Sequence, residues 1–233
     1  MKEFAGKTAV VTGAGGGIGR ALALEAAARG MNVVLADINA GDLNTVDAEL
    51  QASGANTLAA TTDVSQWQAV ETLSKKAREA FGKVHLLFNN AGMFGPRGLD
   101  LRKVWLEVLA VNTVSPARVA GALYKNVAKS QDKLMVFMSS DLGSIAGSTG
   151  GEYSYRSSKA ALNMVVASLA KDLNQYGIRA VAMSPGWVRT DMGGDNAALG
   201  PGESASGIKA VLDSLPASST GIFLKYDGTV VDW

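Results

Sequence analysis

The sequence predicts an α/β protein in which a parallel sheet is covered by helices on both faces. Short apolar runs alternate with longer helical segments along the whole chain, and this alternation is typical of successive βαβ units. The apolar runs lack a strict two-residue alternation, which indicates strands buried on both faces. A chain of 233 residues is long enough for one large domain and short for two. We therefore expect one doubly wound domain over residues 1–233, with a seven-stranded parallel sheet.

The expected elements follow in alternating order. The strands are residues 8–12, 32–36, 57–61, 84–89, 133–139, 179–184 and 221–225. The helices are residues 17–30, 41–54, 66–82, 101–129, 153–177 and 203–215. Several helices end at a glycine, the residue suited to a left-handed helix stop. Between Pro185 and Pro201 a segment rich in Gly, Asp and Asn breaks the alternation. We expect it to form a mobile substrate loop at about 186–202, because ligands of open parallel sheets bind at the carboxyl ends of the strands.

Composition excludes several classes of function. The chain has no cysteine and one histidine, so disulfides, thiolate nucleophiles and multi-histidine metal sites are ruled out. Basic and acidic residues number 22 and 21 and are mixed along the chain, without the basic stripe of a nucleic-acid-binding protein. The apolar runs are too short to cross a bilayer, and the first strand begins too early for a signal peptide. We expect a cytoplasmic protein whose partners are small molecules rather than nucleic acid or membrane.

A glycine-rich turn joins the first strand to the first helix. Glycines at this place let the backbone approach a pyrophosphate that sits on the helix N-terminus. The candidate cofactor residues in the turn are Gly13, Gly16, Gly17, Ile18 and Gly19. A tight strand-to-helix turn with no ligand would use the same residues, so the turn alone leaves both interpretations open.

Asp37, at the end of the second strand, makes a dinucleotide site more specific. An acidic side chain at this distance can bind both ribose hydroxyls of NAD and repels the 2′-phosphate of NADP. Neither Gly16 nor Ile38 and the three residues after it supply a basic partner for a phosphate. The sequence therefore predicts NAD, with NADP disfavoured.

Polar residues also follow the third and fourth strands. Asp63-Val64 comes after the third, and Asn89-Asn90-Ala91-Gly92 after the fourth. Both are candidates for the cofactor site. The alternatives are that Asp63 caps the following helix and that the Asn pair is ordinary turn chemistry.

Tyr155 and Lys159 are the candidate catalytic pair. Their four-residue spacing places both side chains on one helical face. A lysine cation favours the phenolate of a nearby tyrosine and can bring its pKa toward neutrality. Such a pair also arises by chance, but Ser140 ends the preceding strand and could hold a substrate oxygen beside the phenol. Asn112 interrupts an apolar helix, where its amide either serves the site or satisfies a neighbouring backbone carbonyl.

Taken together, these motifs resemble the short-chain dehydrogenase/reductase family from end to end. The matching residues are Thr12-Gly13-x-x-x-Gly17-x-Gly19, Asp63-Val64, Asn89-Asn90-Ala91-Gly92, Asn112, Ser140, Tyr155-x-x-x-Lys159 and Pro185-Gly186. The second half is most similar to C-factor and sniffer-type carbonyl reductases, a subgroup associated with NADPH. The first half, with Gly16 and Asp37, resembles NAD-preferring members. We favour NAD because Asp37 would touch the ribose.

The resemblance implies a Rossmann fold and a role for each site residue. Tyr155 would be the general acid-base, Ser140 would orient the carbonyl, and Lys159 would bind the nicotinamide ribose. By the same resemblance, Asn112 anchors a water, Asp63 and Val64 hold the adenine, and Asn89, Asn90, Ala91 and Gly92 flank the cofactor. Val188 and Thr190 would contact its carboxamide, and Pro185 and Gly186 are further candidates for the cofactor site.

Two departures from the family pattern stand out. Ser140 and Tyr155 lie 15 residues apart, a wider spacing than the family usually has, which leaves Ser139 as an alternative to Ser140. The position of Gly143 favours Ser140. His85 stands where the family commonly has Asp, and a lone histidine in a strand is expected to be structural.

The predicted reaction is reversible hydride transfer between NAD(H) and a carbonyl or secondary alcohol. Mainly apolar candidates for the substrate wall indicate a hydrophobic ketone or aldehyde: Phe94, Tyr153, Trp187 and Met192. The rival hypotheses are an NADP-linked carbonyl reductase and a catalytically idle nucleotide-sensing protein on the same fold. Self-association into a dimer or tetramer is expected through the helices at 101–129 and 153–177.

Overall fold

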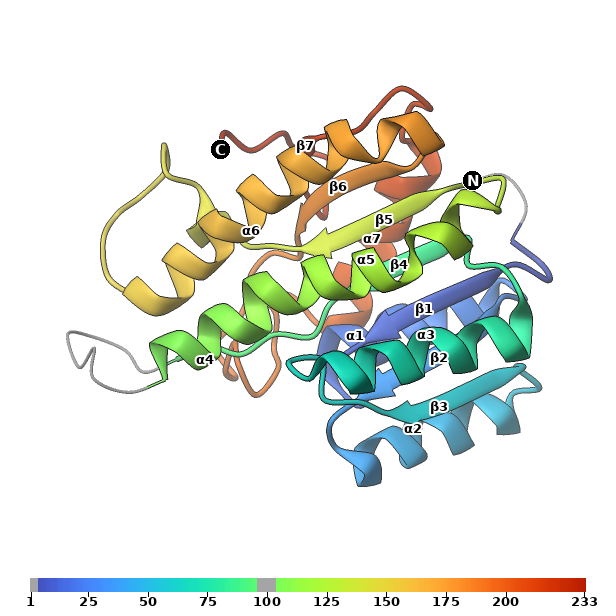
Figure 1. Ribbon diagram of the computed structural model, residues 1–233. Helices are drawn as coiled ribbons and strands as arrows, with labels where there is room; N and C mark the ends of the chain where they lie inside the picture. Colours follow the sequence, from blue (N-terminus) through green and yellow to red (C-terminus); the bar gives the residue numbers. More distant parts are fainter. Residues whose placement is uncertain (1–3, 96–103) are drawn as a thin grey trace.

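Seven parallel strands form the sheet, in the order β3-β2-β1-β4-β5-β6-β7 (Figure 1). The computed structural model describes residues 4–95 and 104–233. The strands are β1 (Thr8–Thr12), β2 (Asn32–Asp37), β3 (Thr57–Thr61), β4 (Leu86–Asn89), β5 (Leu134–Met138), β6 (Arg179–Ser184) and β7 (Ile222–Lys225). All seven predicted strands are confirmed, and so is the doubly wound Rossmann fold.

Helices connect the strands as the alternation predicts. They are α1 (Gly17–Ala28), α2 (Ala40–Ala52), α3 (Trp67–Phe81), α4 (Trp105–Leu109), α5 (Ser115–Ala128), α6 (Tyr153–Asp172) and α7 (Pro201–Ser214). Shorter turns are the π-helix η1 (Ala110–Val114) and the 3-10 turns η2 (Asp141–Gly143) and η3 (Asn174–Tyr176). Among the described residues, no helix is long and apolar enough to cross a membrane.

Two predicted helices differ from the structure. The helix expected at 101–129 is divided into α4, η1 and α5, and residues 101–103 lie outside the described part. A π turn carries one extra residue, so it changes the helical register and is often found at functional sites. The helix expected at 153–177 ends at Asp172 and passes through η3 to Gly177, whose φ of 69° allows the left-handed turn.

The core forms two apolar layers, one on each face of the sheet. Successive strand side chains point to opposite faces, so Val11 packs with α1, α2 and α7 whereas Val10 packs with α3, α5 and α6. Figure 1 shows these helices on the two sides of the sheet. His85 is structural, as expected, because its Nδ1 accepts a hydrogen bond from the Thr8 amide at 3.0 Å.

The strand order reverses between β1 and β4, and this switch point fixes the place of the ligand crevice. The predicted cofactor and catalytic segments follow the carboxyl ends of the strands on both sides of this point. They are the glycine-rich turn after β1, Asp37 in β2, Asn90 to Gly92 after β4, Ser140 after β5 and Pro185-Gly186 after β6.

The predicted substrate loop after β6 is present, and hydrogen bonds between its own residues hold it together. Trp187 Nε1 donates to the Gly193 carbonyl at 2.9 Å, and Val188 pairs with Leu199 as an isolated bridge. The Arg189 guanidinium donates to the carbonyls of Ala197 and Ala198, later in the same loop. Helix α7 then begins at Pro201, slightly earlier than expected.

Candidate active site

The turn between β1 and α1 requires glycine at two positions. Gly13 has a φ of 67°, and a Cβ there would lie 2.9 Å from the Ala91 Cα. A Cβ on Gly19 would lie 1.8 Å from the Gly13 carbonyl oxygen. The Asn90 amide donates to the Thr12 and Gly13 carbonyls at 3.0 and 3.2 Å. The turn is therefore packed against the end of β4, so Asn90 shapes the turn as well as lining the site.

Thr12 strengthens this junction and was not among the predicted site residues. Its hydroxyl accepts hydrogen bonds from the Asn90 and Ala91 amides at 3.0 and 3.1 Å and donates to the Phe88 carbonyl at 3.4 Å. The sequence did contain a signal for this role. Thr12 places a hydroxyl at the last position of a largely apolar strand, directly before the turn.

A cavity of about 900 Å³ runs along the carboxyl ends of the strands. Its volume and its mixed polar and apolar lining suit a dinucleotide together with a small substrate. Most predicted residues line it: Gly13, Gly16, Gly17, Ile18, Gly19, Asp37, Asn90, Ala91, Gly92, Phe94, Ser140, Tyr155, Lys159, Pro185, Gly186, Trp187, Val188, Thr190 and Met192. Ile38, Asp63, Val64, Asn112 and Tyr153 are absent from its lining.

Asp37 closes one end of the cavity. Its Oδ2 accepts from the Gly15 amide and its Oδ1 from the Asn39 amide, both at 2.9 Å. Asp42, in the first turn of α2, also lines this end, and the sequence reasoning missed it. The only basic side chains in the described lining are Lys159 and Arg189, which follow β5 and β6. The end at Asp37 is therefore acidic.

The residues after β3 are absent from the cavity lining and make local contacts. Asp63 Oδ1 accepts from the amide and the hydroxyl of Ser65, at 2.9 and 2.7 Å. The N-cap of α3 is Gln66, so Asp63 forms the turn before the helix rather than the cap itself. Val64 is buried in the core, and Ile38 is exposed.

Tyr153 does not join the predicted substrate wall. It begins α6 two positions before Tyr155, and residues two apart on a helix point to different sides. Its side chain is accordingly exposed, whereas Tyr155 is buried. The remaining wall candidates, Phe94, Trp187 and Met192, do line the cavity.

Asn112 connects three segments around the site. It lies in the π-helix η1, where it is fully buried. Its Oδ1 accepts from the Met93 amide, and its Nδ2 donates to the Met93 carbonyl, both at 2.8 Å, and to Ser158 Oγ at 3.0 Å. The side chain therefore satisfies neighbouring backbone groups and fixes the segment after β4 to α6. Its predicted role in anchoring a water stays a prediction.

The choice between the two serines after β5 is settled by their partners. Ser139 also borders the cavity, but its side chain is buried and its hydroxyl is engaged, since it donates to Asn163 Oδ1 at 2.6 Å. Ser140 also lines the cavity, and its side chain is near enough to Tyr155 to lower the pKa of the phenol. Ser140 is thus the serine placed beside the phenol, as the position of Gly143 predicted.

Burial dominates the titration of Tyr155. It raises the pKa of the phenol to about 12, and the hydrogen bond from Ser140 opposes that rise. The Phe94 ring packs against Tyr155 with centroids 4.5 Å apart. The pKa of Tyr155 therefore lies above its ordinary value and not, as expected, closer to neutrality, because desolvation is the largest effect on the free protein.

Lys159 is held in a buried position beside the phenol. Its Nζ donates to the Met138 carbonyl at 2.7 Å and lies 5.6 Å from the centroid of the Tyr155 ring. Burial lowers the pKa of Lys159 to about 8. A Cβ on Gly92 would lie 3.6 Å from the Lys159 Nζ and 3.3 Å from Asn112 Oδ1, so these groups converge on the segment after β4.

This burial predicts a pH dependence of stability that Lys159→Met should remove. Between pH 8 and the ordinary lysine value of 10.5, the unfolded chain holds a proton that the folded protein has lost. The free energy of unfolding of the wild type, measured relative to that of Lys159→Met, therefore rises with pH across this window. The rise is on the order of 3 kcal/mol. Tyr155 contributes the opposite slope above pH 10, but it is present in both proteins. Urea denaturation at several pH values measures the difference, and a constant difference would contradict the burial of this amine.

The site has the parts that a nicotinamide dinucleotide needs. Glycines leave the backbone accessible at the N-terminus of α1. At the acidic end of the cavity, Asp37 and Asp42 can accept hydrogen bonds from hydroxyl groups of a ligand. The hydroxyls of Ser140 and Tyr155 and the amine of Lys159 line the same cavity. The fold and this site define a dinucleotide-binding oxidoreductase.

Comparison with known proteins gives the family. The family described as short chain dehydrogenase matches residues 7–198. The C-signal of Myxococcus xanthus is 38% identical over 157 residues, covering 65% of this chain and 94% of that protein. The chain belongs to the short-chain dehydrogenase family and is an oxidoreductase that uses a nicotinamide cofactor.

Solved structures agree over the whole chain. The carbonyl reductase Sniffer of D. melanogaster has a TM-score of 0.88 at 30% identity and covers 98% of this chain and 100% of that one. The NADPH-bound carbonyl reductase from chicken fatty liver has a TM-score of 0.90 at 27% identity, with 100% of both chains covered. A 7α-hydroxysteroid dehydrogenase complexed with NADH has a TM-score of 0.85 at 28% identity, covering 99% and 96%. The predicted likeness to C-factor and sniffer-type proteins is confirmed.

Proposed function

We propose that the protein is an NAD-preferring reductase that interconverts neutral ketones or aldehydes and secondary or primary alcohols. The observation that carries this proposal is the Tyr155 phenol beside the buried amine of Lys159, in one cavity with Ser140 and Asp37. The carbonyl reductase and hydroxysteroid dehydrogenase structures described above support the reaction class.

In this proposal, side chains of the protein donate the proton and stabilise the phenolate that is left. A bound nicotinamide supplies the hydride. Tyr155 stays protonated at neutral pH because its pKa is about 12, so it is a proton donor to the carbonyl oxygen. Ser140 holds the same oxygen by a hydrogen bond. The Lys159 ammonium, with a pKa of about 8, favours the phenolate that remains after proton transfer.

Asp37 supports NAD over NADP. A second carboxylate, Asp42, lies at the same end of the cavity. The Arg189 guanidinium is engaged by the carbonyls of Ala197 and Ala198 and by Glu203, 3.6 Å away. A 2′-phosphate at the Asp37 end would therefore meet two negative charges and no basic side chain of the described lining.

Asp37→Asn is expected to reverse part of this preference. Removing the charge weakens NADH binding by roughly tenfold or more, since a hydrogen bond to a charged group contributes about 1.5–3 kcal/mol. NADPH binding should tighten, because the repulsion is relieved. Fluorescence titration with both cofactors measures the two changes, with Asp172→Asn at the exposed end of α6 as the control.

A wild-type protein that binds NADPH more tightly than NADH would overturn this preference. It would favour the NADP-linked alternative, which the NADPH-bound carbonyl reductase structure supports. Tight cofactor binding without turnover of any carbonyl would favour an idle nucleotide sensor instead.

The proposed substrate is an apolar, uncharged carbonyl compound. Phe94, Trp187 and Met192 line the cavity, and Phe94 packs against Tyr155. Asp141 and Asp191 add negative charge to the lining. The test is NADH oxidation with a panel of ketones and aldehydes that includes carboxylated and phosphorylated members. Turnover confined to the anionic members would contradict the proposed substrate class.

We also propose a dimer or tetramer. Leu106 of α4 and Met164 of α6 expose 82% and 67% of their surface in the single chain. Ala160, Ala161, Val165, Ala167 and Leu169 remain partly exposed on α6. Light scattering measures the oligomeric state, and a monomer would contradict this part of the proposal.

A further inference from the structure

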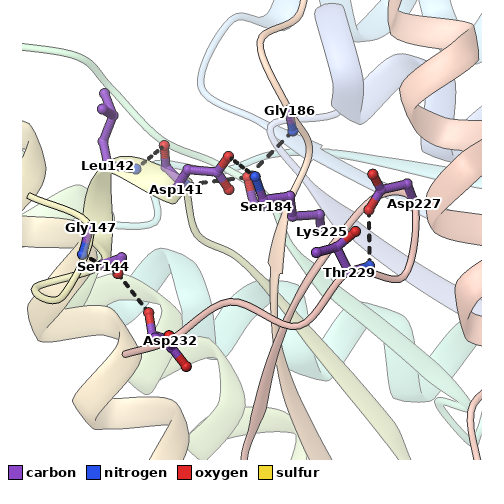
Figure 2. A network of polar contacts seen from close by, with 11 residues as sticks. Asp141, Leu142, Ser144, Gly147, Ser184, Gly186, Lys225, Asp227, Thr229 and Asp232 are labelled. Carbon is purple, nitrogen blue, oxygen red and sulfur yellow. Dashed lines mark hydrogen bonds and ion pairs between the residues drawn. The ribbon is translucent and has the colours of Figure 1, made fainter.

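The loop that carries Ser140 is fixed from outside the cavity by the last residues of the chain (Figure 2). We call residues 140–147 the serine loop and residues 226–233 the C-terminal segment. Ser144 Oγ donates to the Asp232 carbonyl at 2.6 Å, and the Ala146 amide donates to the Trp233 carbonyl at 3.2 Å. Two parts of the chain that are far apart in sequence are therefore joined next to the site.

The C-terminal segment is itself held on the edge of the sheet. The Lys225 amide donates to the Thr229 carbonyl at 2.8 Å, and the Val231 amide donates to the Phe223 carbonyl at 2.9 Å. The Trp233 ring stacks on Phe223 with centroids 5.7 Å apart. The serine loop is thus connected to β7 through an ordered segment.

A direct contact between β7 and the serine loop is made by Lys225. Its Nζ lies 2.9 Å from Asp141 Oδ2, and Asp141 is the neighbour of Ser140 in the chain. The Asp141 amide donates to Ser184 Oγ at 3.2 Å, which also accepts from the Gly186 amide at 3.4 Å. Figure 2 shows this contact between the ends of β5, β6 and β7.

On its other side the serine loop rests on the helix that carries the catalytic pair. A Cβ on Gly143 would lie 2.7 Å from Lys159 Cβ and 2.9 Å from the Lys159 carbonyl carbon. The Asn163 amide donates to the Gly143 carbonyl at 3.1 Å. The loop is therefore held between α6 and the end of β7, and Ser140 lies where these two supports meet.

We infer that Lys225 is a positioning residue for the proton-donor pair. Its ion pair with Asp141 holds the start of the serine loop so that the Ser140 hydroxyl lies against the Tyr155 phenol. Lys225 is not in the lining of the cavity, so it acts through Asp141 and not on the substrate. This inference rests on the proposed carbonyl reduction.

An ordinary surface ion pair would leave the chemistry unchanged. The Lys225 and Asp141 side chains are 35% and 43% exposed, and pairs of this kind contribute little to stability. The two interpretations therefore differ in what they change. Positioning of Ser140 affects kcat, whereas a surface pair affects neither kcat nor the motion of the loop.

The test compares Lys225→Met with Lys225→Arg, and uses Lys171→Met at the exposed end of α6 as the matched control. We expect Lys225→Met to lower kcat for the best ketone of the panel by about two- to fivefold, the range of a lost partly exposed ion pair. The Kd of NADH should change less than about twofold. Lys225→Arg should restore most of kcat, and Lys171→Met should match the wild type. Asp141→Asn should lower kcat as Lys225→Met does, and the double variant should be no worse than either one.

Hydrogen exchange gives a readout that needs no substrate. In Lys225→Met the amides of the serine loop should exchange faster, while those of the β1–α1 turn should keep the wild-type rate. An unchanged kcat in Lys225→Met, additive losses in the double variant, or unchanged exchange in the serine loop would each overturn the inference. If the wild type reduces no carbonyl of the panel, the proposed function fails, and the exchange measurement alone decides whether Lys225 anchors the loop.

Discussion

Replacing Tyr155 by Phe is expected to remove turnover while NADH binding stays nearly intact. The substitution deletes the hydroxyl that donates the proton, a contribution of roughly 10²- to 10⁴-fold in rate. The ring itself remains packed against Phe94, so the shape of the cavity is kept. Steady-state turnover of the best ketone and fluorescence titration with NADH measure the two effects.

Tyr124→Phe is the matched control for this prediction. Tyr124 lies on α5, packs against Tyr176 and is absent from the cavity lining. It should retain wild-type turnover. If Tyr155→Phe turned over ketone at a similar rate to this control, the assignment of the proton donor would be wrong.

The second large effect is expected from Gly19→Ala. The new Cβ would lie 1.8 Å from the Gly13 carbonyl oxygen and 2.6 Å from the Asn90 amide nitrogen. Either the turn or the start of α1 must move, at a cost of about 1–3 kcal/mol in the free energy of unfolding. The same movement displaces the backbone that faces the cavity, so NADH affinity should fall by at least roughly tenfold, a change of about 1.4 kcal/mol.

Gly16→Ala separates this steric effect from a general loss of glycine. Gly16 has extended backbone, with a φ of −165°, and a Cβ there meets no protein atom within 4 Å. Its free energy of unfolding should stay within about 0.5 kcal/mol of the wild type. Equal destabilisation by the two substitutions, measured by urea denaturation, would contradict the packing described for the turn.

Most of the fold could be predicted because its strands are buried on both faces. β1 and β5 are buried at every position, and short runs with a largely apolar sequence are typical of strands inside a parallel sheet. The π turn at Ala110–Val114 could not be predicted, since one inserted residue hardly changes the apolar periodicity of a long helix. The buried amide of Asn112 was its only signal in the sequence.

The candidate site, like the fold, could be predicted only in part from the sequence. Tyr155, Lys159 and Ser140 were predictable because their spacing and order along the chain fix their place in the fold. The pKa of Tyr155 was not, because desolvation depends on Phe94 and other groups that fold around it. The contact of Lys225 with Asp141 joins residues 84 positions apart, and no local pattern indicates it.

The central claim is that Tyr155 and Lys159 serve hydride transfer to a carbonyl carbon. The most direct measurement uses NADH deuterated at the transferred position together with a neutral aromatic ketone, and follows the label by mass spectrometry and NMR. We expect deuterium on the carbinol carbon of the alcohol in the wild type, and none in Tyr155→Phe. Tight NADH binding with no label on the carbinol carbon of any ketone or aldehyde in the panel would contradict the account.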